Sequence, residues 1–181
     1  MPRFPAVPFG LVLMSAAAFG AQAEVKDAGA AGFTVENAVV VAADADTTWR
    51  ALVGDVDRWW PKDHSWWGNE SKLSIEPRAG GCFCEIAPDG RQAQHLHVVY
   101  VEPGRTLRLT GGLGPLQGMG LHGVLEFQLA AAERGTRVSM RYRAGGYTPD
   151  GVERLAAVVD RVQAMQLGGL AKYLDARSPQ R

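Results

Sequence analysis

Cysteine is scarce in this chain, and neither sign of charge is in excess. The 181 residues include two cysteines, 19 lysines and arginines, and 19 aspartates and glutamates. Two cysteines cannot form a disulfide scaffold, so the fold must rest on a hydrophobic core. Balanced charge argues against non-specific nucleic-acid binding, which needs clustered basic residues. We therefore expect one globular domain with no nucleic-acid partner.

The sequence also lacks an apolar run long enough to cross a bilayer. The apolar run at residues 7–19 has about 13 residues, whereas a spanning helix needs about 20. Arg3 precedes this run, and Ala21-Gln22-Ala23 follows it in the small-x-small pattern that signal peptidase accepts. We predict a signal peptide over residues 1–23 and an exported mature chain with no integral membrane span, periplasmic in a Gram-negative source.

The rest of the chain divides into a leader, one domain and a tail. Residues 24–32 are rich in Ala and Gly and are predicted to be disordered, residues 33–176 form the domain, and residues 177–181 are the tail. A strand is predicted over residues 33–42, followed by a helix that starts near Thr47 and a short helix that ends at Pro61. Turn signals then separate six predicted strands. These cover residues 72–76, 81–87, 93–101, 106–113, 121–129 and 136–144.

The later strands alternate apolar and polar residues, as in a sheet with one covered face. Val138, Met140 and Tyr142 share one face, and arginines dominate the other. Residues 150–176 have apolar residues at helical spacing and are the large segment available to cover the sheet. The fold class is therefore α+β, a curved antiparallel sheet of about seven strands wrapped on a long C-terminal helix, with two short helices after the first strand. Gly168-Gly169 predicts a bend or a close helix-to-sheet approach.

Five segments carry a family resemblance: Ala45-Asp46-Thr47-Thr48-Trp49, Trp59-Trp60-Pro61, Gly80-Gly81-Cys82-Phe83-Cys84-Glu85, Val101-Glu102-Pro103-Gly104-Arg105-Thr106-Leu107 and Gly135-Thr136-Arg137-Val138. They resemble the SRPBCC or START-like superfamily, and in particular its branch named after activators of a heat-shock ATPase. The resemblance implies the helix-grip fold, with an apolar pocket for lipid-like, aromatic or polyketide-like molecules. It does not imply the chaperone partner or ATP, because an exported protein would meet neither.

Two cysteines and two histidines fall at alternate positions on neighbouring predicted strands. A two-residue loop would place Cys84 opposite His95 and Cys82 opposite His97, a ligand set suited to zinc or copper. Pro88-Asp89-Gly90 is instead typical of a three-residue loop, which separates the pairs onto opposite faces. The following hairpin places both histidines on the polar face, so a buried metal site is disfavoured. A Cys82–Cys84 disulfide is also disfavoured, because an extended strand holds the two side chains near or beyond bridging distance.

Aromatic and methionine side chains are the candidates for a ligand pocket. Trp66 and Trp67 follow a short helix and are predicted to line or gate the pocket mouth, beside His64. The glycine-rich run at residues 111–120 lacks the ending of a phosphate loop, so it is a flexible connection or a mobile lid with Leu116 or Met119 at its tip. The full set of predicted ligand-binding residues is His64, Trp66, Trp67, Tyr100, Met119, Phe127, Met140, Tyr142, Tyr147 and Met165.

These patterns favour a non-catalytic binder or carrier of a small hydrophobic or amphipathic ligand. Asp63, His64 and Ser65 are consecutive and so point in different directions, which argues against a hydrolytic triad. An alternative is a cyclase or dehydratase in which His64, Tyr142 or Tyr147 moves a proton on an apolar substrate. A second alternative is a periplasmic metal-binding protein that uses the Cys/His hairpin. No cofactor is expected.

Overall fold

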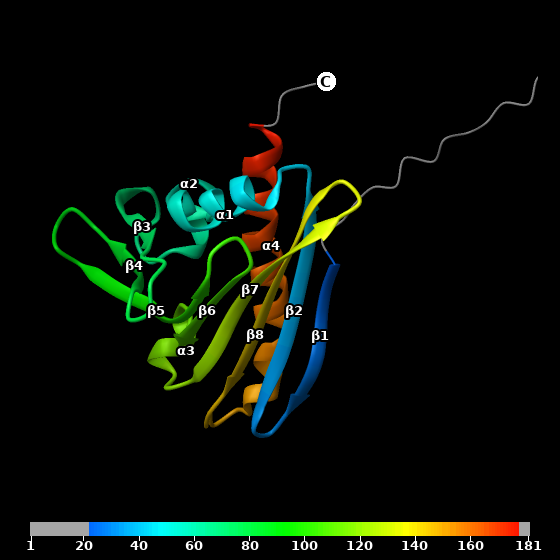
Figure 1. Cartoon of the computed structure of the whole chain (residues 1–181). Helices are drawn as coiled ribbons and strands as arrows, with labels where there is room; N and C mark the ends of the chain where they lie inside the picture. Colours follow the sequence, from blue (N-terminus) through cyan, green and yellow to red (C-terminus); the bar gives the residue numbers. More distant parts are fainter. Residues whose placement is uncertain (1–21, 178–181) are drawn as a thin grey trace, which may run out of the picture.

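A curved antiparallel sheet and one long helix make up most of the domain (Figure 1). The computed structural model describes residues 22–177. The strands are β1 (Gln22–Gly29), β2 (Gly32–Val41), β3 (Lys72–Ile75), β4 (Cys82–Ile86), β5 (Gln92–Glu102), β6 (Thr106–Gly111), β7 (His122–Ala132) and β8 (Gly135–Gly145). The helices are α1 (Ala45–Gly54), α2 (Val56–Trp59), α3 (Pro115–Gly118) and α4 (Ala156–Asp175), with 3₁₀ turns η1 (Lys62–His64), η2 (Gly68–Glu70) and η3 (Val152–Leu155). The strand order β1-β2-β8-β7-β6-β5-β4-β3 confirms the predicted α+β helix-grip class.

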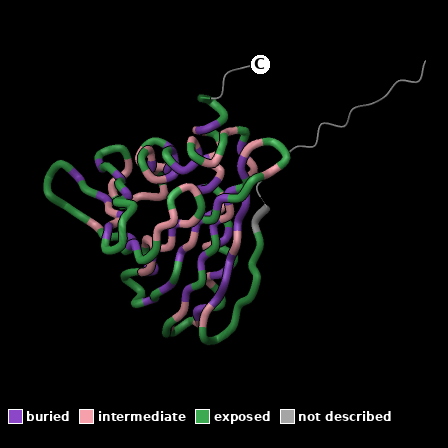
Figure 2. The backbone as a smooth tube through the Cα atoms, in the orientation of Figure 1, coloured by how far each residue is buried: buried purple, intermediate pink, exposed green. Residues whose placement is uncertain are grey.

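The inner face of the sheet carries the core, and α4 packs across it. Along β7 and β8 buried and exposed residues alternate, as the purple and green segments of Figure 2 show. Leu125, Phe127 and Tyr142 are at most 1% exposed. A buried polar contact also joins helix to sheet, because Asn37 of β2 donates to the side chain of Asp160 of α4 at 3.2 Å. This contact fixes α4 against β2 in one position along the helix.

The two short helices after β2 close one end of the sheet. Asp44 caps α1 by accepting a hydrogen bond from the backbone N–H of Thr47 at 2.7 Å, as the sequence predicts. The indole N–H of Trp59 in α2 donates to the backbone oxygen of Ala51 at 3.0 Å. Trp59 is 3% exposed, so it joins α2 to α1 within the core.

The strand β1 is a correction to the predicted leader over residues 24–32. Its residues pair antiparallel with β2, from Gln22 opposite Ala38 to Gly29 opposite Gly32. The residues from Glu24 to Ala30 are all exposed. An edge strand of this kind is held by backbone hydrogen bonds, which every residue type except proline can donate, so its sequence shows no apolar alternation. The sheet therefore has eight strands rather than seven.

The Gly168-Gly169 pair does not interrupt the C-terminal helix, because α4 continues through both residues. A Cβ on Gly169 would lie 2.3 Å from the backbone oxygen of Trp59, whereas a Cβ on Gly168 would meet nothing within 4 Å. The close approach is therefore real but joins α4 to α2 instead of to the sheet, and Gly169 alone requires it.

The predicted signal peptide falls on residues 1–23, of which residues 1–21 lie outside the described residues. The predicted tail likewise lies outside them beyond Arg177. Within residues 22–177, no helix has the length and apolar character needed to cross a membrane.

Candidate functional site

A cavity of about 330 Å³ lies between the first half of α4 and the inner face of the sheet. Its walls are mostly apolar, and its rim carries three exposed apolar side chains: Trp66, Met119 and Val158. The lining residues come from five parts of the chain. They are Trp60, Asp63, His64, Ser65 and Trp66; His95; Leu113, Gly114, Pro115, Leu116 and Met119 with Tyr142; and Leu155, Val158, Val159, Val162, Gln163 and Gln166.

Three polar residues in this cavity have side-chain atoms without hydrogen-bond partners among the described residues. Gln163 is 1% exposed, and neither its amide nitrogen nor its amide oxygen is paired. The amide oxygen of Gln166 and Nδ1 of His64 are buried and unpaired as well. A buried polar atom without a partner costs about 1–3 kcal/mol. The residues that line the cavity therefore include hydrogen-bonding groups that are not paired within residues 22–177.

The carboxylate of Glu85 forms a buried hydrogen-bond network behind the cavity wall. Its Oε1 accepts from the backbone N–H of Trp67 at 3.0 Å and from the hydroxyl of Ser71. Its Oε2 accepts from the backbone N–H of Trp66 at 3.0 Å and lies 3.0 Å from Nε2 of His95. Glu85 thus fixes the loop that carries Trp66 at the cavity rim.

The network determines the charges of Glu85 and His95. Burial alone would raise the pKa of Glu85, but hydrogen bonds from Ser71, Trp66, Trp67 and His95 outweigh it and hold that pKa below its ordinary value. Burial lowers the pKa of His95, and the hydrogen bond to Glu85 only partly opposes this. An ionised Glu85 can only accept a hydrogen bond from His95. A neutral His95 therefore carries its proton on Nε2 and has a lone pair on Nδ1. His95 therefore has a fixed orientation on the cavity wall, and its burial favours the neutral imidazole.

A β-bulge brings His95 to the inner face, contrary to the prediction that it lies on the polar face. The loop is the three-residue Pro88-Asp89-Gly90, with Gly90 at φ 88°. Next to it Cys84 pairs with Gln94, but beyond the bulge Cys82 pairs with His97. The register of the three-residue loop therefore holds next to the loop, and the register of the two-residue loop holds beyond the bulge. The extra residue is His95, and it points inward like the adjacent Leu96.

The prediction that Cys82 and Cys84 do not form a disulfide is wrong, because a disulfide joins them. Their Cα atoms are 5.4 Å apart, within the usual bridging range. An extended strand would place them about 6.4–6.8 Å apart. The strand is locally contracted where it pairs with the bulge, and this contraction brings the two side chains together.

The Cys/His metal site that the two-residue loop would create does not form. Both sulfurs are in the disulfide, and His95 and His97 lie on opposite faces of β5. Among residues 22–177, no group of three or more His, Cys, Asp and Glu side chains is arranged to hold a metal ion.

Four of the ten predicted ligand-binding residues line the cavity: His64, Trp66, Met119 and Tyr142. Phe127 and Met140 are core residues at 1% and 0% exposure. The other four lie away from the cavity. Trp67 packs under the guanidinium of Arg91, Tyr100 packs against Arg108 on the outer face, Tyr147 is 83% exposed, and Met165 lies on a separate surface hollow of α4.

Sequence reasoning missed Glu85, Gln163 and Gln166, and it placed His95 on the wrong face. Glu85 shares the face of Phe83 in the alternation of β4, and that alternation was a usable signal for a buried carboxylate. Gln163 and Gln166 are three positions apart, next to Val159 and Val162 on one helical face. Their position on an apolar stripe was a second usable signal.

The glycine-rich run forms a short helical rim segment above the cavity. It contains α3, with Leu116 buried and Met119 half exposed. The Tyr142 hydroxyl donates to the backbone oxygen of Gly111 at 3.0 Å and accepts from the N–H of Leu113 at 3.3 Å. Burial raises the pKa of Tyr142, so this hydroxyl remains a donor. Tyr142 thus ties the start of the rim segment to the sheet.

Comparison with solved structures assigns the architecture. The chain matches no protein-family model and no curated protein. It is similar to MLL2253 from Mesorhizobium loti, with a TM-score of 0.59 and 24% identity over 80% of this chain and 98% of that one. It is similar to CalU16 from Micromonospora echinospora, with a TM-score of 0.59 and 15% identity over 88% and 87% of the two chains. It is also similar to DynU16 of the dynemicin biosynthetic locus, with a TM-score of 0.58 and 22% identity over 82% and 49%. These likenesses, with the sheet and α4, define the helix-grip fold.

Proposed function

We propose that this protein binds a small amphipathic molecule in the cavity between the sheet and α4, as an exported member of the SRPBCC or START-like superfamily. The observation that carries the proposal is the buried amide of Gln163, which lines a mostly apolar cavity and has no hydrogen-bond partner within residues 22–177. A ligand that both donates and accepts a hydrogen bond would pair with this amide and offset the cost of burying it.

The geometry favours a compact ligand with an apolar body. Cavities that hold small molecules are about 300–1,000 Å³, and the volume here, about 330 Å³, is near the lower end. Val159 and Val162 supply apolar contacts next to Gln163 on α4. The ligand we propose therefore has an apolar body and at least one amide, hydroxyl or carboxyl group directed at Gln163.

Ligand capture and a cavity-filling variant test the proposal. Native mass spectrometry of gently purified protein should show a co-purified small molecule, which solvent extraction releases. The fluorescent probe 1-anilinonaphthalene-8-sulfonate should bind at one saturable site that Val162→Trp removes. Val124→Trp adds the same side chain at an exposed position of β7 and should leave probe binding unchanged. Equal probe binding by the two variants would contradict a ligand site in this cavity.

Export is part of the proposal, and two observations support it. The first 23 residues have the signal-peptide pattern, and a disulfide such as Cys82–Cys84 persists in oxidising compartments. Expression with a C-terminal tag, followed by fractionation and N-terminal sequencing, tests it. Glu24 at the new N-terminus of a periplasmic product is the expected result. A cytosolic product that retains the first 23 residues would contradict export.

A second candidate function is proton transfer by a cyclase-type or dehydratase-type enzyme, and the Glu85–His95 pair favours it. His95 Nδ1 would accept a proton from a substrate carbon or oxygen, while Glu85 stabilises the resulting imidazolium. The probe 5-nitrobenzisoxazole tests this, because removal of its C–H proton breaks the ring N–O bond and releases a coloured phenolate. Wild type should accelerate the reaction and His95→Gln should not, whereas the exposed His122→Gln keeps the rate. Equal rates for wild type and His95→Gln would exclude this role.

A further inference from the structure

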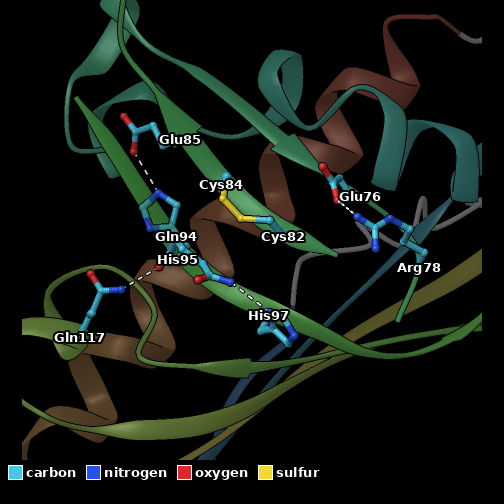
Figure 3. The surroundings of a disulfide bond; sticks show 9 residues. All are labelled: Glu76, Arg78, Cys82, Cys84, Glu85, Gln94, His95, His97 and Gln117. Carbon is cyan, nitrogen blue, oxygen red and sulfur yellow. Dashed lines mark hydrogen bonds and ion pairs between the residues drawn. A yellow bond between two sulfur atoms is a disulfide. The ribbon is translucent and has the colours of Figure 1, made fainter. Parts of the chain in front are cut away.

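The Cys82–Cys84 disulfide lies on β4 beside His97 of β5 (Figure 3), and neither cysteine lines the ligand cavity. Both cysteines are partly exposed, whereas Phe83 and Glu85, which alternate with them along β4, are buried on the inner face. The two sulfur atoms are therefore on the solvent side of a strand whose other side is anchored in the core.

This disulfide contributes little to holding the fold together. It closes a loop of only three residues within one strand, and the stabilisation from a cross-link decreases as the loop shortens. The strand is already paired on both sides, with β3 and with β5. Burial of Phe83 at 1% exposure and Glu85 at 0% holds it further. We therefore expect β4 to stay in place when the bond opens.

Polar side chains of two neighbouring segments, β5 and residues 76–78, lie beside the disulfide. His97 of β5 is the cross-strand partner of Cys82, and its Nδ1 lies 3.1 Å from the amide nitrogen of Gln94, the partner of Cys84. On the other side of Cys82, the backbone N–H of Glu76 donates to the Cys82 oxygen at 2.9 Å. The carboxylate of Glu76 is paired with Arg78 at 2.8 Å. Within residues 22–177, the imidazole of His97 therefore lies next to Cys82 without an ion-pair partner.

We propose that Cys82–Cys84 is a thiol–disulfide exchange site for low-molecular-weight thiols in solution. Partly exposed disulfides that do not stabilise a fold are the labile kind. A thiolate from solution attacks one sulfur, the Cys82–Cys84 bond breaks, and the other cysteine leaves as a thiolate that takes a proton. A second external thiolate then attacks the external sulfur of the mixed disulfide. Two external thiols are oxidised to one disulfide. The protein disulfide is reduced to two thiols, which take up the two protons that the external thiols released.

Equilibration with glutathione tests the proposal. The chain has only two cysteines, so alkylation followed by intact mass counts this site alone. Native protein in buffers of varying reduced and oxidised glutathione should show a reversible two-electron transition, with an unchanged far-UV circular dichroism spectrum. A bond that persists in millimolar reduced glutathione, or that opens only when native structure is lost, would overturn the proposal.

Single variants test the two steps separately. Cys84→Ser should leave Cys82 to form one stable glutathione adduct, and Cys82→Ser should do the same through Cys84. The double variant should form no adduct and should melt within a few degrees of wild type. His97→Asn should slow the exchange several-fold, while His122→Asn, at an exposed histidine of β7, should not. A double variant that cannot fold would show that the bond is structural, and equal exchange rates for both histidine variants would exclude His97.

Discussion

Nε2 of His95 lies 3.0 Å from Oε2 of Glu85, and both side chains are buried at 6% and 0% exposure. This contact connects the loop at the cavity rim to the cavity wall, because the same carboxylate also accepts the backbone N–H groups of Trp66 and Trp67. Glu85 therefore determines both where the rim loop lies and which nitrogen of His95 carries the proton.

Glu85→Gln should lower the free energy of unfolding by about 2–4 kcal/mol. The N–H groups of Trp66 and Trp67 bind different oxygens of the carboxylate, so the NH₂ group of a glutamine meets a donor in either orientation. Chemical denaturation checks this result. The control is Glu102→Gln, which removes an exposed ion pair whose Arg105 nitrogen lies 2.9 Å from the Glu102 carboxylate. This variant should change stability by less than about 1 kcal/mol. Equal losses in the two variants would show that the network is not stabilising.

Stability should fall in two pH windows. The pKa of folded His95 lies below its ordinary value of 6.5, so below that pH the unfolded chain binds a proton that the folded chain excludes. The His95 contribution is complete above 6.5 and is lost as the pH falls towards the folded-state pKa. The same holds for Glu85 below its ordinary value of 4.5. Unfolding free energies measured across this range should decrease less in the upper window for His95→Gln, whereas His122→Gln should behave as wild type.

Adjacent glycines of α4 should respond oppositely to alanine. Gly168→Ala should stabilise the protein by about 1 kcal/mol, because its Cβ meets nothing and alanine favours a helix. Gly169→Ala should destabilise it by about 1–3 kcal/mol, because its Cβ would lie 2.3 Å from the backbone oxygen of Trp59. Thermal unfolding of the two variants checks this difference. Equal shifts would mean that α4 does not approach α2 so closely.

The sequence predicted the fold well because side-chain burial repeats along its strands. Met140 and Tyr142 alternate with exposed arginines, and this period requires a sheet with one covered face. The same reasoning could not find β1, whose residues from Glu24 onward are exposed. Its pairing depends on backbone groups, so no side-chain pattern marks it.

The site was harder to predict because it depends on one inserted residue. The bulge in β5 reverses the direction of His95 relative to a regular strand, and sequence periodicity assumes no insertions. The Cys82–Cys84 disulfide could not be predicted for a related reason. Ideal strand spacing places the two Cα atoms too far apart for a disulfide, and the local contraction of β4 is not visible in the sequence. Gln163 could have been found, since an amide on the apolar stripe of a helix needs a partner.

Gln163→Leu should raise the stability of the ligand-free protein while weakening ligand retention. Leucine has nearly the same size and removes two buried polar atoms that have no partner among residues 22–177, so unfolding should cost about 1–3 kcal/mol more. The ligand would lose its hydrogen bonds to this amide, so less of any co-purified molecule should remain bound.

The control is Gln128→Leu on the outer face of β7, where the amide already donates to Glu126 at 2.6 Å. That variant should neither stabilise the protein nor change ligand content. A residue kept for ligand binding is expected to lower the stability of the ligand-free protein. If Gln163→Leu is less stable than wild type and still retains the ligand, this amide serves the fold and not the ligand.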